Sequence, residues 1–146
     1  MAPPSPVAAR YIELGIRYAV ALIFLASALG KMVFGSVVTT LFLLTATQEV
    51  LSPSLAKAGV MILTAAEGIV ALGLLVRPHC LAFYRVGLAL CGASIVGLFL
   101  AGTQDCGCFG DVLVLGVREH RGLVLTLSTL VFVGWIMAGR LTKVGS

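Results

Sequence analysis

Charged side chains are scarce in this chain. They account for 11% of its 146 residues, whereas 60% of the residues are hydrophobic and the mean hydropathy is +1.11. A soluble domain of this size leaves too much of its surface in water to hide so many apolar side chains. The scarcity of charge therefore excludes an ordinary soluble domain and indicates that lipid is the solvent. At this length we expect a single transmembrane domain over residues 1–146.

A strong charge of one sign and a standard set of metal ligands are also lacking. The formal net charge is only +4 and is spread along the chain, so no nucleic acid is expected as a partner. The four cysteines and two histidines do not follow the spacing of a four-ligand zinc site, so no metal is predicted.

What the sequence does have is four long apolar runs. They lie at about 16–34, 56–76, 81–102 and 123–139. A helix needs roughly 20 apolar residues to cross the hydrocarbon layer, and backbone polar groups in lipid must be satisfied within the segment. The sequence therefore predicts an all-α integral membrane protein, an antiparallel four-helix transmembrane bundle.

Two further stretches flank the first predicted span. Residues 36–54 contain an apolar run that is too short to span and carries several threonines, which predicts an interfacial or re-entrant segment between the first two spans. The proline-rich opening predicts a short flexible tail over residues 1–9. Glu13 and Arg17 are four residues apart, which favours a helix that begins before the membrane.

The distribution of basic residues predicts the orientation. Six lie on the side that holds both termini: Arg10, Arg17, Arg77, Arg85, Arg140 and Lys143. Four lie on the other side: Lys31, Lys57, Arg118 and Arg121. By the positive-inside rule, both termini are expected to be cytoplasmic in the cell (inner) membrane. The connection between the third and fourth spans is then extracytoplasmic, where disulfides can persist.

That connection carries a Cys-x-Cys pair, Cys106 and Cys108, separated by Gly107. The glycine allows the tight backbone that two near-neighbour sulfurs need to meet. A disulfide in so small a ring is expected to be strained and labile, and it would restrict very little chain entropy. The pattern therefore favours redox chemistry. A structural disulfide or two buried thiols remain the alternatives.

An ionisable residue, Glu67, lies near the middle of the second predicted span. Such a group is costly in hydrocarbon and usually faces the bundle interior or a cavity. Lys31 and Arg85 are the two cations expected within reach of it. The group is either a proton site beside a quinone or a structural ion pair between helices, and we favour the ion pair. Cys91, in the third span, is expected to behave as a small buried hydrophobe.

The chain resembles the MauE-type methylamine-utilisation membrane proteins, within the wider DoxX-like four-helix set. The most specific element of the resemblance is the motif Cys106-Gly107-Cys108-Phe109-Gly110. Supporting elements are Gly30-Lys31, Glu67-Gly68 and Gly73-Leu74-Leu75. The resemblance implies a part in maturing methylamine dehydrogenase, whose small subunit needs many disulfides, together with a thioredoxin-like partner. It also implies that the two motif cysteines form the redox pair, with Gly107, Phe109 and Gly110 supporting the loop.

Our leading hypothesis is therefore a membrane thiol–disulfide relay. The Cys-x-Cys pair would exchange electrons between an extracytoplasmic thioredoxin-like protein and a membrane carrier such as quinone. The alternative is a non-catalytic accessory subunit of a larger membrane complex. A quinone-sized cavity beside the cysteine loop would favour the relay, and a sealed bundle with a broad apolar outer face would favour the accessory subunit.

Overall fold

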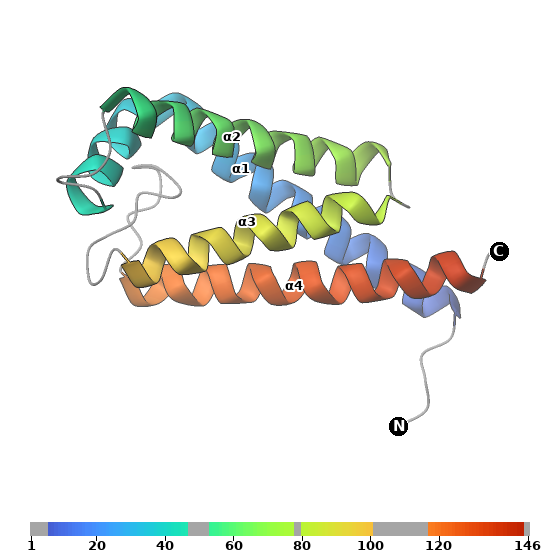
Figure 1. The fold of residues 1–146 in the computed structure, drawn as a ribbon. Coiled ribbons are helices and arrows are strands. Elements are labelled where there is room, and N and C mark those ends of the chain that lie inside the picture. The colour runs from blue at the N-terminus through green and yellow to red at the C-terminus, as the bar shows by residue number, and fades with distance from the viewer. Residues whose placement is uncertain (1–5, 47–52, 78–79, 101–116, 145–146) are drawn as a thin grey trace.

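The structure, a computed structural model, describes residues 6–46, 53–77, 80–100 and 117–144, and within these ranges every element is a helix. The helices are α1 (Pro6–Ala46), α2 (Pro53–Val76), α3 (Leu81–Leu100) and α4 (Val117–Val144). Successive helices run in opposite directions, and the start of α1 and the end of α4 lie at the same end of the molecule (Figure 1). The predicted all-α membrane bundle is confirmed.

The ends of the helices follow from local chemistry. Pro6 and Pro53 are the first residues of α1 and α2, where the missing N–H of proline would have no helical partner in any case. Helix α2 ends just before Arg77, which precedes a proline and is therefore disfavoured in helical conformation. The Arg77 N–H donates to the Gly73 carbonyl at 2.9 Å, and the Cys80 N–H donates to the Arg77 carbonyl at 3.1 Å. This tight turn reverses the chain between α2 and α3.

Helix α1 is longer than the sequence analysis predicted. Its 41 residues correspond to about 61 Å, well above the roughly 30 Å of a hydrocarbon core. Residues 6–9, predicted as part of the flexible tail, are helical, and residues 36–46, within the predicted interfacial or re-entrant segment, are helical and continuous with the first span. No proline interrupts residues 16–46, so nothing in the backbone ends the helix there. The last part of α1, teal in Figure 1, turns away from the direction of the rest.

Three stretches of the described helices are long and apolar enough to cross a membrane. They are 7–33 in α1, 57–76 in α2 and 122–140 in α4. Helix α3 has 20 residues, about 30 Å, although the apolar stretch found in it, Leu81–Val96, is shorter. The protein is therefore a membrane protein, and we expect α3 to provide the fourth span.

The four helices form a ring in which α1 and α3 each contact α2 and α4. Every helix contributes to one central apolar core, whose buried residues are Val20, Ala21, Phe24, Val70, Ala71, Leu74, Tyr84, Cys91, Leu127, Val131 and Ala138. Many large apolar side chains also remain exposed on the outside, among them Leu22, Leu29, Met61, Ile62, Ile69, Leu72 and Phe132. An outer surface of this kind is suited to lipid.

Candidate functional site

A buried ion pair joins α1 to α2. The Lys31 Nζ lies 2.5 Å from Oε1 of Glu67, and the two side chains are only 4% and 6% exposed. Lys31 lies toward the C-terminal end of its apolar stretch and Glu67 lies in the middle of its own, and the length of the lysine side chain closes the difference in depth. The pair places two opposite charges inside the bundle, where each needs the other.

Ser27 completes the pair into a closed network. Its hydroxyl donates to the Oε2 of Glu67 at 3.1 Å and accepts a hydrogen bond from the Lys31 Nζ, also at 3.1 Å. Both carboxylate oxygens of Glu67 are therefore bonded within the protein. The sequence analysis did not identify Ser27. The available signal was its position four residues before Lys31, which puts both side chains on one face of α1.

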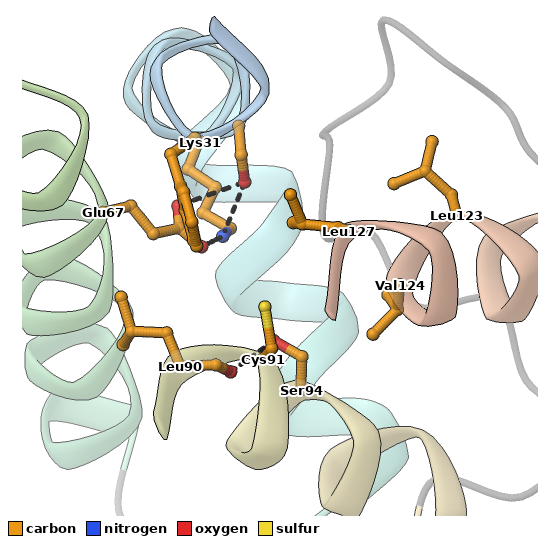
Figure 2. Close-up of a pocket in the computed structure, with 10 residues that line it drawn as sticks. Lys31, Glu67, Leu90, Cys91, Ser94, Leu123, Val124 and Leu127 are labelled. Carbon is orange, nitrogen blue, oxygen red and sulfur yellow. Dashed lines mark hydrogen bonds and ion pairs between the residues drawn. The ribbon is translucent and has the colours of Figure 1, made fainter. Parts of the chain in front are cut away.

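A small cavity of about 30 Å³ lies beside this network. Its lining comes from all four helices: Phe24, Ser27, Lys31, Glu67, Leu90, Cys91, Ser94, Leu123, Val124 and Leu127. Figure 2 shows the side chains of Lys31 and Glu67 meeting across one side of it, opposite Cys91. One side of the cavity is thus polar, and α4 contributes only leucine and valine side chains.

The cavity lies toward the end of the bundle where α3 leads into α4. Ser94 is six residues before the end of α3 and Leu123 is six residues after the start of α4, which places both about 9 Å inside the helix ends. The Cys-x-Cys motif belongs to the connection between these two ends. Cys106, Gly107, Cys108, Phe109 and Gly110 lie outside the described residues, so the predicted redox pair and its supporting loop remain predictions.

Cys91 is a free thiol and is buried. Its sulfur points toward the Lys31–Glu67 pair (Figure 2). Burial agrees with the expected small hydrophobe, but the surroundings of the thiol are more polar than a lone cysteine in an apolar run suggests. Ser94, the neighbouring polar residue on α3, donates its hydroxyl to the Leu90 carbonyl at 3.0 Å.

Arg85, the other cation considered for Glu67, does not take part in this network. It is exposed on α3, whereas Lys31 is buried against the carboxylate. Arg85 lies six residues before Cys91, which places it about 9 Å farther from the cavity end of the bundle. The structure therefore brings together Lys31 and Glu67 and leaves Arg85 outside.

A second polar cluster lies near the opposite end of the bundle. The Tyr84 hydroxyl donates to Oε1 of Glu13 at 3.2 Å, and Tyr84 is completely buried. Arg17, also buried, lies with its guanidinium carbon 5.5 Å from the centre of the Tyr18 ring. Glu13 thus bonds to a tyrosine from α3. The cluster ties the start of α1 to the start of α3.

The cavity is small among the described residues. Pockets that enclose a drug-sized molecule measure roughly 300–1,000 Å³, and this cavity measures about 30 Å³. Among the residues that the structure describes, no three His, Cys, Asp or Glu side chains gather as a metal site would require. The Lys31–Glu67 pair places a base beside an acid, so the two side chains can share or exchange a proton.

The comparisons with known proteins point to one family. Residues 9–142 match the family model described as methylamine utilisation protein MauE. No curated protein and no solved structure matches the chain. The match covers nearly the whole chain, including all four helices apart from the first residues of α1 and the last of α4. The chain therefore belongs to the MauE family of methylamine-utilisation membrane proteins.

Proposed function

We propose that this protein is a membrane thiol–disulfide relay that uses Cys106 and Cys108. The observation that carries the proposal is the position of this pair in the sequence. It lies in the connection between α3 and α4, and the two helix ends that this connection joins are the ones nearest to the buried Ser27–Lys31–Glu67 network. Family membership supports it, because the family is one of methylamine utilisation. The resemblance implies that this process needs the maturation of a dehydrogenase subunit with many disulfides.

The chemistry is a thiol–disulfide exchange with an extracytoplasmic thioredoxin-like protein. A thiolate of one partner attacks a disulfide sulfur of the other, forming a mixed disulfide and releasing one thiolate. A second thiolate then resolves the mixed disulfide. One protein ends as a disulfide and the other as a dithiol, and two electrons and two protons have passed between them. Net turnover requires a second exchange partner, for which we propose a membrane carrier of the quinone class. We assign the carrier no contact in the described cavity, which is far smaller than a pocket for a drug-sized molecule.

The experiment that tests this proposal is capture of the mixed disulfide. In a Cys108→Ser variant, an exchange partner attached to Cys106 cannot be resolved and accumulates as a covalent complex. The Cys106→Ser variant serves as the matched variant, and the Cys106→Ser/Cys108→Ser double variant is the control that captures nothing. We expect a reductant-sensitive complex with a thioredoxin-like protein from at least one single variant. If neither single variant captures a protein, the relay is contradicted.

The alternative is a non-catalytic accessory subunit of a larger membrane complex. The small size of the described cavity favours it, because a relay to a quinone would need a larger site elsewhere. An accessory subunit would support maturation of its partner even without Cys106 and Cys108. Maturation that is lost in the double cysteine variant, while the protein itself accumulates normally in the membrane, would argue against this alternative.

A further inference from the structure

We propose that Ser27, Lys31, Glu67 and the adjoining cavity form a hydrated proton-transfer site within the membrane. The inference deepens the proposed function and rests on it for its biological purpose, because two-electron thiol chemistry also moves two protons. The site itself is inferred from the geometry of the described residues alone.

The first step of the argument is hydration. A water molecule needs roughly 10–15 Å³ of cavity volume and two to four polar partners. The cavity measures about 30 Å³, which leaves room for one or two water molecules. Lys31 has three N–H donors, of which two are directed to Glu67 and Ser27. Its remaining donor, the further lone pairs of Glu67 and the Ser94 hydroxyl offer the partners that water requires.

The second step is the proton transfer. In the ion pair, Lys31 carries the proton and Glu67 is a carboxylate. If one N–H bond of Lys31 breaks and an O–H bond forms on Oε1 of Glu67, both side chains become neutral and no electron moves. The transfer covers the length of one hydrogen bond, because the Lys31 Nζ and Oε1 of Glu67 lie only 2.5 Å apart. Ser27 can serve as a second route, because it accepts from Lys31 and donates to the other carboxylate oxygen.

The third step is the set of groups that face the pair. Among the cavity residues, α1 contributes Lys31, α2 contributes Glu67 and α3 contributes the Cys91 thiol, whereas α4 contributes no titratable group. One base, one acid and one thiol therefore share a single small space. A purely structural ion pair needs no cavity beside it, and apolar side chains packed on every side would hold it equally well. The cavity next to it, which is polar only on the side of Lys31 and Glu67 and lies about 9 Å inside the ends of α3 and α4, is where a proton of the pair would exchange with water.

The test is infrared spectroscopy of the full chain in lipid nanodiscs, in H₂O and in D₂O, at several pH values. We expect a carbonyl stretch from a protonated carboxyl group that shifts in D₂O and is lost in Glu67→Gln. Glu13→Gln is the matched control, because Glu13 is also buried in α1–α3 packing but lies far from the cavity, and it must leave this band in place. Should Glu67→Gln fail to fold, Glu67→Asp must shift the band.

Two further variants test the route. Ser27→Ala removes the second path, and Ser94→Leu fills the cavity, so each is expected to slow deuterium exchange of the Glu67 band. Absence of any band that depends on Glu67, or exchange that Ser94→Leu leaves unchanged, would overturn the proposal. The same spectra recorded in a Cys106→Ser/Cys108→Ser background separate the two proposals. The band must persist there, whether or not the cysteines form a relay.

Discussion

Lys31 and Glu67 neutralise each other, Ser27 bonds to both, and all three side chains are buried. Each of the three therefore matters chiefly through the other two. Removing one charge leaves the second buried without compensation, which is far more costly than removing both. Stability measurements on single and double variants can therefore distinguish a dependent pair from two independent polar residues.

Lys31→Met is expected to destabilise the protein by about 3–5 kcal/mol, because it leaves the buried Glu67 carboxyl group without its partner. The measurement is the free energy of unfolding in mixed detergent and lipid micelles. The double variant Lys31→Met/Glu67→Leu is expected to recover most of the loss. Arg85→Met, at an exposed position, is the control and should change stability by no more than about 0.5 kcal/mol. A Lys31→Met protein as stable as the wild type would contradict the dependence.

At the scale of elements, α4 packs closely against its neighbours at Gly134. A Cβ atom added there would lie 2.7 Å from Cε1 of Tyr84 and 3.2 Å from Cγ2 of Ile16. Tyr84 is completely buried and bonded to Glu13, so its ring has little freedom to move away. The absence of a side chain at Gly134 therefore allows α1, α3 and α4 to meet.

Gly134→Ala is expected to destabilise the bundle by about 1–3 kcal/mol through overpacking against Tyr84. Gly92→Ala is the matched control, since it is also a helical glycine but has no atom within 4 Å of the added Cβ. There the better helix propensity of alanine should leave stability unchanged or raise it by up to about 1 kcal/mol. Thermal unfolding of the two variants side by side provides the comparison. Equal effects at both positions would show that the contact at Gly134 is unimportant.

The elements also show what the sequence could predict. Apolar runs of spanning length specified helices, because lipid leaves the backbone no other way to satisfy its polar groups. Lipid also penalises an unpaired charged side chain, so Glu67 required a partner, and Lys31 was one of two candidates. Choosing between Lys31 and Arg85 depended on the rotation of each helix, which a bundle sets through packing. The contact between Glu13 and Tyr84 joins residues 71 positions apart and depends on the same rotation. The sequence analysis underestimated the length of α1, because a helix that continues past its apolar run has no helix-ending signal where that run stops.

At the scale of the whole molecule, the four described helices alternate in direction, so the start of α1 and the end of α4 lie at one end. The basic residues favour that end as cytoplasmic, which would put Cys106 and Cys108 on the outer side, where thiols can be oxidised. The sidedness matters to the proposed function, because a relay serving an extracytoplasmic protein must present its cysteines to that compartment.

We predict that a membrane-impermeant maleimide labels Cys106 in intact, reduced cells. The protein used should keep Cys106 as its single cysteine. A second protein that keeps only Cys80, a free cysteine at the opposite end of α3, is the control and should be labelled only after permeabilisation. The reverse pattern would show that the molecule sits in the membrane in the opposite orientation.

The relay requires that Cys106 and Cys108 cycle between a dithiol and a disulfide, and a redox titration measures this directly. The purified protein in nanodiscs is equilibrated with thiol–disulfide buffers of defined ratio, and the fraction oxidised is read from the mass added by alkylation. With Cys80 and Cys91 replaced by serine, we predict one transition between a doubly alkylated and an unalkylated form, reversible in both directions. A pair that stays reduced in strongly oxidising buffer, or stays bonded under strong reductant while the protein is folded, would contradict the proposed function.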